Sequence, residues 1–335
     1  MMKRIIFRAD GNAKDGLGHL YRLFALVEML SDDFECVFLT KETSTINVIP
    51  PKYIIRLLPD TVSLIDEASW ISENYSAENS ILITDGYQFN SNYQQEIKKK
   101  GFKLVYVDDL SSEYMYADLV INHSPHIREN NFISEPYTRF ALGTKYAILR
   151  PLFLEAAKKY RAIPQVIEKA FICFGGSDYH DLTLKAVKSL LNIEQFNEIN
   201  VVLGGAYQHT EIFELEKVYS KIKIYQNVSE SDLIRIMERC HFAIAPTSTV
   251  LFELCAVKMI VFSGYYVDNQ QKAFEAFKEN GIIYGIGDFK NVSIDDIKTE
   301  IFKIIDYNHD KLFQKQFDVF DGLQKDRILE SVKKM

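Results

Sequence analysis

The sequence predicts an α/β protein with two Rossmann-like, doubly wound domains that face each other across a cleft. Three observations lead to this fold class. The chain has 335 residues, about twice the length of a common domain. Short apolar runs alternate with helical patterns, as they do where crossover helices connect parallel strands. Each half of the chain has its own series of such runs, so each half is expected to build one sheet.

The first half predicts an N-terminal domain over residues 1–160. Its short apolar runs read as strands buried on both faces, at 4–8, 36–39, 81–84, 104–107 and 119–121. The segment 155–168 is rich in Lys and Arg, contains Pro164 and has no strand pattern. We therefore place the domain border within it.

The second half predicts a C-terminal domain over residues 169–310, with the more regular alternation. Its strands are expected at 171–174, 200–203, 222–225, 241–245 and 260–262, with helical patterns between them. Ser229, followed three residues later by Asp232, opens one of these helices much as a capping box would. A helical tail is expected over 311–335, able to pack on either domain.

Composition and charge exclude several classes of protein. A hydrophobic content of 47% and a charged content of 25% are those of an ordinary folded protein. The net charge of -7, without a run of Lys and Arg, argues against a nucleic-acid partner bound through its phosphates. The longest apolar stretch, 242–262, is interrupted by Pro246, Glu253 and Lys258, so no membrane partner is expected.

Cysteine usage and the first residues favour a cytoplasmic protein. The four cysteines stand far apart without a Cys-x-x-Cys pair, so neither a zinc ribbon nor a disulfide framework is indicated. The apolar run near the start reaches a charged residue after three positions, which is too short for the core of a signal peptide.

A glycine-rich segment follows the first predicted strand and leads into a helix. Gly11, Gly16 and Gly18 allow backbone amides to approach a ligand, and the helix start attracts an anion. His19 falls in the first helical turn, where the dipole favours the neutral imidazole that suits a base. Tyr21 stands where the dinucleotide fingerprint needs glycine. The structural alternative is a tight turn with a histidine that packs or caps.

A hydroxyl-rich turn follows the strand at 241–245. Thr247, Ser248 and Thr249 offer donors to a diphosphate at a helix start, and Glu253 lies about one turn deeper, where its carboxylate is able to accept ribose hydroxyls. A simple N-cap explains the hydroxyls equally well. Gly175 and Gly176 follow the strand expected at 171–174. They form either a tight turn or a turn that leaves room for a nucleotide.

Neither a metal nor another cofactor is indicated. The chain has no Asp-x-Asp pair, and its one close histidine pair, His123 and His126, has no further ligand nearby. A Gly-x-Ser-x-Gly nucleophile motif is also absent. The remaining chemistry is a histidine base acting on water or on an acceptor hydroxyl.

Taken together and in order, these motifs resemble a known family. The matching segments are Asp10 to His19 with Arg22, Asp85-Gly86-Tyr87, Val107-Asp108-Asp109, Asn122, Gly143 to Arg150, Gly175-Gly176-Ser177-Asp178, Thr247-Ser248-Thr249 with Glu253, and Asn269-Gln270. The sequence is similar to the UDP-sugar hydrolases of pseudaminic acid biosynthesis, themselves similar to the peptidoglycan N-acetylglucosaminyltransferase. The resemblance covers about residues 5–280.

The resemblance implies the glycosyltransferase-B architecture and a metal-independent hydrolysis. UDP would leave a UDP-2,4-diacetamido-2,4,6-trideoxyhexose as water attacks the anomeric carbon with inversion, and the small-molecule nucleotide sugar and water would be the partners. By match, the catalytic residues are His19, as the base, and Tyr87. The implied substrate-binding residues are Asp10, Gly16, Gly18, Arg22, Gly175, Gly176, Thr247, Ser248, Thr249 near the diphosphate, Glu253 at the ribose, Asn269 at the sugar, and Gln270.

The family pattern is not matched everywhere. Asp85-Gly86-Tyr87-Gln88 stands where Asp-His-Tyr-Gly is commoner, and the chain continues for longer after Gly287. Two other functions stay open: an inverting UDP-sugar glycosyltransferase of the same fold, in which His19 deprotonates an acceptor, and a nucleotide-sugar binding protein that has lost the chemistry.

Overall fold

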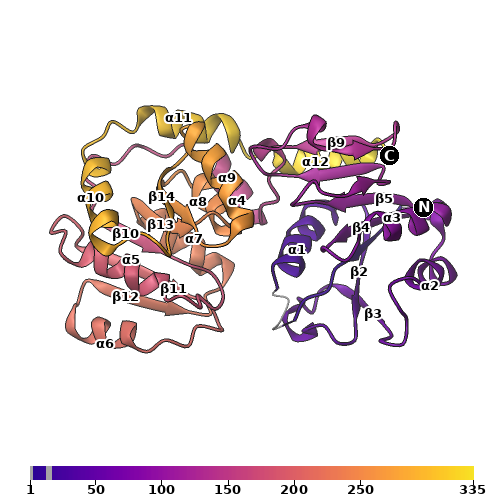
Figure 1. Cartoon of the computed structure of the whole chain (residues 1–335), viewed down its shortest axis with the longest axis horizontal. Coiled ribbons are helices and arrows are strands. Elements are labelled where there is room, and N and C mark those ends of the chain that lie inside the picture. The colour runs from indigo at the N-terminus through magenta and orange to yellow at the C-terminus, as the bar shows by residue number, and fades with distance from the viewer. Residues whose placement is uncertain (1–2, 13–16) are drawn as a thin grey trace. The chain divides into compact units, whose positions relative to one another are not determined.

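The chain divides into two compact units in the computed structural model, which describes residues 3–12 and 17–335. Unit 1 comprises Met1–Pro151 and Leu323–Met335, and unit 2 comprises Leu152–Gly322. In Figure 1 the yellow helix α12 (Gln324–Lys333) lies among the indigo and magenta elements of unit 1. The end of the chain thus completes the unit that its beginning forms.

Unit 1 contains a parallel sheet with the strand order β3-β2-β1-β4-β5-β7-β9. Its strands are β1 (Arg4–Arg8), β2 (Glu35–Lys41), β3 (Ile54–Leu58), β4 (Ser80–Asp85), β5 (Lys103–Val107), β7 (Leu119–Asn122) and β9 (Arg139–Leu142). Two short strands, β6 (Tyr114–Met115) and β8 (Ile133–Ser134), pair separately. The helices are α1 (Gly18–Leu30), α2 (Glu67–Asn74), α3 (Ser91–Lys99) and α12.

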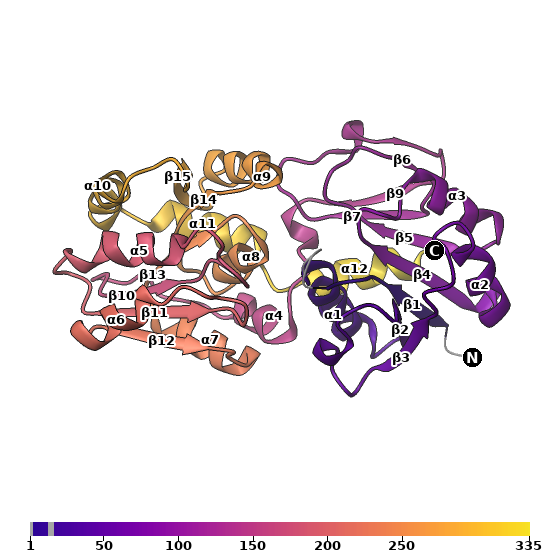
Figure 2. The same ribbon diagram turned by 60° about the horizontal axis from the view of Figure 1, so that its bottom comes forward.

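The central strand and the first helix of unit 1 are formed by residues that the core buries. Ile5, Ile6 and Phe7 of β1 are fully buried, as expected for a parallel strand covered on both faces. Helix α1 buries Leu20 and Leu23 together with other residues of its apolar face, at helical spacing. Figure 2 shows β1, β2 and β3 side by side on one side of β4.

Helix α12 is attached to unit 1 by an apolar face and by polar contacts. Ile328 and Val332 are buried, and Lys325 Nζ lies 2.7 Å from Asp32 Oδ2. Exposed ion pairs contribute little free energy, so the apolar burial is the main attachment.

Unit 2 contains a second parallel sheet with the order β12-β11-β10-β13-β14-β15. The strands are β10 (Lys169–Ile172), β11 (Glu198–Leu203), β12 (Ile222–Gln226), β13 (Phe242–Pro246), β14 (Ile260–Tyr265) and β15 (Tyr284–Asp288). The helices are α4 (Pro151–Lys158), α5 (Leu182–Leu191), α6 (Glu211–Val218), α7 (Glu230–Arg239), α8 (Thr249–Ala256), α9 (Asp268–Glu279), α10 (Ile294–Ile305) and α11 (Asp310–Val319).

These two sheets confirm the predicted α/β class with two Rossmann-like units. The apolar runs did not indicate β3, β9 and β15. β3 is an edge strand with Ile54 and Leu57 exposed, so its pattern is not that of a buried strand. β15 contains Gly285 and Gly287, and glycine weakens a strand pattern. In the predicted tail, α11 belongs to unit 2 and α12 to unit 1.

A buried lysine ties three helices of unit 2 together. Lys258 is fully buried, and its Nζ donates to the carbonyls of Ala157 (3.0 Å), Ala256 (2.9 Å) and Phe320 (2.7 Å). These carbonyls lie at the C-terminal ends of α4, α8 and α11, where the helix dipoles attract a cation. Burial lowers the pKa of Lys258 to about 8. The contacts are those of a structural anchor.

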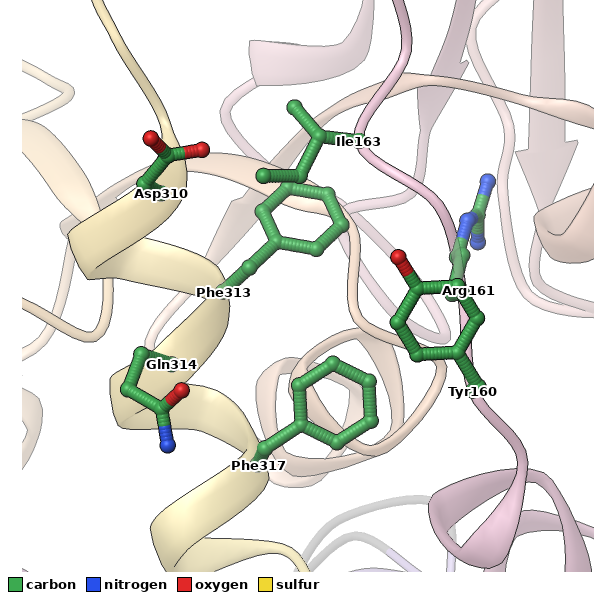
Figure 3. Close-up of a pocket in the computed structure, with 7 residues that line it drawn as sticks. All are labelled: Tyr160, Arg161, Ile163, Asp310, Phe313, Gln314 and Phe317. Carbon is green, nitrogen blue, oxygen red and sulfur yellow. The ribbon is translucent and has the colours of Figure 1, made fainter.

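A groove of about 400 Å³ lies close to this anchor, between α11 and the segment that follows α4 (Figure 3). Its walls include Phe313, Phe317 and Tyr160. Arg161, also at the groove, donates to the carbonyls of Val257 and Cys240, which precede β14 and β13. The groove therefore lies at the amino edge of the sheet, whereas doubly wound sheets bind ligands at the carboxyl edge.

Candidate functional site

The strand order of unit 1 reverses between β1 and β4, and this switch point collects the predicted catalytic residues. In doubly wound sheets the loops on the two sides of the switch point diverge and leave room for a ligand. His19 lies in the first turn of α1, which follows β1, and Asp85 is the last residue of β4. The sheet register pairs Arg8 with Thr84, so the two loops leave the sheet side by side.

His19 and Asp85 form a short hydrogen bond. His19 Nδ1 lies 2.7 Å from Asp85 Oδ1, the Asp85 side chain is fully buried, and that of His19 is 18% exposed. An ionised carboxylate only accepts, so Nδ1 of the neutral ring carries the proton and Nε2 carries the lone pair. This pairing fixes the orientation of the imidazole and leaves Nε2 as a proton acceptor.

Arg22, one turn along α1, bridges two carboxylates. It donates from Nε to Asp85 Oδ2 (2.6 Å), from Nη2 to Asp85 Oδ1 (2.6 Å) and from Nη1 to Asp109 Oδ1 (2.5 Å). Burial alone would lower the pKa of Arg22, but the charges of Asp109 and Asp85 raise it well above its ordinary value. Burial would likewise raise the pKa of Asp109, and the charge of Arg22 holds it below the usual range.

Tyr87, the second predicted catalytic residue, follows β4 directly. Its ring meets that of His19 edge-on, with centroids 4.9 Å apart, and 53% of the residue is exposed. Gly86 before it has φ +150°, and a Cβ there would lie 2.5 Å from Gln88 Oε1. Tyr87 is thus beside His19 and also accessible from outside.

Asp10 belongs to a buried network next to the end of β1. Its Oδ1 accepts from Arg8 Nη1 (2.5 Å) and from the backbone N–H of Lys41 (2.9 Å). Burial would raise the pKa of Asp10, but the hydrogen bond and charge of Arg8 hold it below its usual value. Arg8 is itself fully buried against Glu67, so this network is part of the folded core of unit 1.

Of the two glycines near His19 that were predicted to bind substrate, one lies among the described residues. Gly18 begins α1, and a Cβ added to it would meet no atom within 4 Å. Gly16 was also predicted to bind substrate, and it lies outside the described residues.

The structure adds residues that the predicted site did not include. Asp85 contacts His19 and Arg22, and Asp109 contacts Arg22, as described above. His123, after β7, is buried beside this cluster and accepts at Nδ1 from the backbone N–H of Ile148 (3.3 Å). Burial and then the charge of Arg22 lower the pKa of His123 to about 4. All three residues stand at strand ends, and Asp85 and Asp109 also lie in segments that carry the family resemblance.

The strand order of unit 2 reverses between β10 and β13. Gly175 and Gly176 follow β10, and a Cβ added to either would meet nothing within 4 Å, although Gly175 has φ +87°. Gly204 differs, because its Cβ would lie 2.4 Å from Gly176 Cα. Packing therefore requires glycine at 204, whereas the space beside Gly176 is open.

The two helix starts near this switch point are capped differently. Asp178 accepts from the backbone N–H groups of Leu182 (2.9 Å) and Thr183 (2.7 Å), so it satisfies the start of α5. At α8 the N-cap residue Ser248 makes no side-chain capping hydrogen bond, and Thr249 is exposed in the first turn. The start of α8 thus keeps amide donors for an anion.

The remaining predicted residues of unit 2 lie around α8 and α9. Thr247 is buried, and its hydroxyl donates to the Gly264 carbonyl (3.1 Å), so it joins β13 to β14. Glu253 is buried on α8, four residues after Thr249 and so on the same helix face. Asn269 is exposed at the start of α9. Gln270 accepts from the backbone N–H of Tyr266 (3.2 Å).

The described parts of the chain hold neither a metal-ion site nor a membrane-spanning helix. No group of three or more His, Cys, Asp or Glu side chains there forms a metal-ion site. Over residues 3–12 and 17–335, no helix combines the length and the apolar character needed to cross a bilayer.

Solved structures define the class of fold. MurG of Acinetobacter baumannii matches with a TM-score of 0.68 at 11% identity, over 99% of this chain and 100% of that protein. The calicheamicin glycosyltransferase CalG4 also gives 0.68, at 10% identity over 100% and 98%. UGT2 of Phytolacca americana, solved with UDP-2-fluoro-glucose and pterostilbene, gives 0.62 at 11% identity over the whole of both chains. The chain therefore has the glycosyltransferase-B fold, as predicted.

Two sequence relatives match most of this chain. MJ1062 of Methanocaldococcus jannaschii, described as uncharacterized, is 28% identical over 290 residues, which are 82% of this chain and 58% of that protein. The chain thus spans less than two thirds of MJ1062. UDP-2,4-diacetamido-2,4,6-trideoxy-β-L-altropyranose hydrolase of Campylobacter jejuni is 24% identical over 279 residues, 80% of this chain and 93% of that protein. No protein-family model matches the chain.

Proposed function

We propose that the protein is a nucleotide-sugar hydrolase that releases UDP from a UDP-2,4-diacetamido-2,4,6-trideoxyhexose, with inversion at the anomeric carbon. The observation that carries the proposal is His19, oriented by Asp85 at the switch point of unit 1 with its Nε2 lone pair available. The similarity to the Campylobacter jejuni hydrolase supports the choice of sugar. The resemblance of the sequence motifs implies a place in pseudaminic acid biosynthesis.

The proposed reaction is a single displacement. The oxygen of water forms a bond to the anomeric carbon while the bond from that carbon to the β-phosphate oxygen breaks. The electron pair leaves with UDP, and the proton of water passes to His19 Nε2. The buried carboxylate of Asp85 stabilises the imidazolium that results. Tyr87, whose ring touches His19, is proposed to contact the sugar or the attacking water.

We assign the nucleotide to unit 2. Amides at the start of α8 would stabilise the diphosphate, including the charge that develops on UDP as it leaves. The open space beside Gly176 leaves room for the nucleotide, and Glu253 would accept the ribose hydroxyls. Asn269, exposed at the start of α9, is proposed to contact the sugar. Phosphate binding by amides and a helix dipole requires no metal ion.

Hydrolysis in ¹⁸O-labelled water tests the proposal. The protein is incubated with the UDP-diacetamido-trideoxy sugar in EDTA, and the products are separated and weighed by mass spectrometry. Attack at the anomeric carbon puts the label in the released sugar and none in UDP. Label in the nucleotide would contradict the proposed bond cleavage. UDP binding without release would instead favour the glycosyltransferase, which needs an acceptor.

A further inference from the structure

Arg22 was predicted to bind substrate, and in the structure its guanidinium is held by two carboxylates of the protein. All three guanidinium nitrogens donate to carboxylates, in four hydrogen bonds of 2.5–2.9 Å to Asp85 and Asp109. The side chain is only 10% exposed. A guanidinium held by two carboxylates has little left to offer a diphosphate, because each of its forks is already occupied.

The charge of the surrounding cluster matches the needs of a base. Asp85 and Asp109 carry two negative charges and Arg22 one positive charge, so the cluster is singly negative while His19 is neutral. When His19 takes up a proton, the cluster becomes electrically neutral. Because Asp85 is shared between His19 and Arg22, any change in Arg22 alters the negative charge that His19 experiences.

We propose that Arg22 and Asp109 are positioning residues, which set how strongly Asp85 holds a proton on His19, and that neither contacts substrate. The kinetic part of this inference rests on the proposed hydrolysis. The proton equilibrium of His19 does not, because it is measurable without substrate. Among the residues that the structure describes, the titratable or charged groups around His19 are Arg22 on α1, Asp85 on β4, Tyr87 after β4, Asp109 after β5 and His123 after β7.

The two variants Arg22→Gln and Asp109→Asn move the equilibrium in opposite directions. In Arg22→Gln, Asp85 loses its competing cation and acts on His19 with its full charge, so His19 keeps its proton to higher pH. In Asp109→Asn, one negative charge is lost and Arg22 interacts more strongly with Asp85, so His19 releases its proton at lower pH. The loss of one charge next to an ionisable group moves the titration midpoint of that group by about one pH unit.

The experiment is a pH titration of the His19 ring by ¹H–¹⁵N NMR on the full chain, with His19→Ala to assign the signal. Arg56→Gln, at an exposed position of β3, is the matched control and is expected to leave the midpoint unchanged. We expect an upward shift in Arg22→Gln and a downward shift in Asp109→Asn, with UDP affinity within threefold of the unaltered protein. The acid limb of the rate–pH profile should shift in the same directions.

Other outcomes would overturn the proposal. Midpoints that stay unchanged in both variants would show a merely structural role. An unchanged midpoint with a tenfold or greater loss of UDP affinity in Arg22→Gln would make Arg22 a substrate ligand. If Arg22→Gln does not fold, the isosteric Asp109→Asn decides alone, and a midpoint that fails to fall contradicts the inference. A protein without hydrolase activity still gives the NMR result, so failure of the two proposals is distinguishable.

Discussion

The two units of this chain share one strand order around their switch points but differ in what fills them. At the switch point of unit 1, His19, Arg22, Asp85 and Asp109 hold one another through short hydrogen bonds. At that of unit 2, the space beside Gly176 is open and the N-cap residue of α8 makes no side-chain capping bond. A preset charge cluster suits proton transfer, whereas open amides suit binding of an anion.

The two units also place buried charge at different edges. In unit 1 the charged cluster is at the carboxyl edge, where ligands bind. In unit 2 the fully buried Lys258 is beside the amino edge, where its Nζ donates to three helix-end carbonyls and lies 4.8 Å from the centroid of the Phe317 ring. We therefore propose that the same fold uses a buried charge for chemistry in one unit and for stability in the other.

The largest expected effect is that of removing the base. His19→Ala should lower the rate of hydrolysis about 10³-fold, because a positioned general base contributes about 10²–10⁴-fold. UDP affinity should stay within a few fold of the unaltered protein, since the nucleotide is assigned to unit 2. Steady-state kinetics and calorimetric titration with UDP check both values. Full activity in this variant would remove His19 from the mechanism.

The anchor of unit 2 gives the next effect. Lys258→Met should lower the free energy of unfolding by about 3 kcal/mol, because three helix-end carbonyls lose their donor. Urea unfolding at pH 7 measures it. Lys315→Met, at an exposed position on α11, is the control and should be near neutral. A loss of UDP affinity in folded Lys258→Met would contradict the separation between anchor and binding site.

The difference in the free energy of unfolding between the unaltered protein and Lys258→Met should depend on pH, because the pKa of Lys258 is lowered. Between about pH 8 and its ordinary value of 10.5, the unfolded chain keeps a proton that the folded chain has released. The free energy of unfolding should therefore rise with pH in this window, relative to Lys258→Met. A difference between the two proteins that stays constant from pH 7 to 11 would show that burial does not favour the neutral amine.

The variant Glu253→Ala tests whether Glu253 binds the ribose of UDP. We expect UDP binding to weaken by about 1–3 kcal/mol, the cost of leaving buried hydroxyl groups without a partner. Glu275→Ala, at an exposed position of α9, serves as control. Calorimetry with UDP and with uracil alone compares the two variants. If Glu253→Ala binds UDP normally, the ribose contact is elsewhere.

Two glycine variants give the smallest effect and the clearest separation of binding from folding. Gly176→Ala should leave the Tm unchanged, since its Cβ meets nothing, but should weaken UDP binding about tenfold by crowding the ligand. Gly204→Ala should lower the Tm, because its Cβ would lie 2.4 Å from the backbone of Gly176. Calorimetric scans and UDP titrations of both variants suffice. Equal UDP affinity in Gly176→Ala would place the nucleotide away from this turn.

The sequence predicted the strands that are buried on both faces, because apolar runs record burial directly. It also located His19, Gly175 and Thr249 at strand or helix ends. The ion pairs of Arg22 with Asp85 and Asp109 could not be predicted, because these two residues are 63 and 87 positions away from Arg22 in the sequence. The sequence also did not reveal that the Thr247 hydroxyl donates to the Gly264 carbonyl.

The central claim, activation of water by His19 for attack on a UDP-sugar, is tested most directly by the anomer first released. Proton NMR follows UDP-2,4-diacetamido-2,4,6-trideoxy-β-L-altropyranose with the protein in EDTA during the first minutes, before mutarotation. The account predicts UDP and the α anomer, formed by inversion, and no release with His19→Ala. Initial release of the β anomer, or release that persists in His19→Ala, would contradict it.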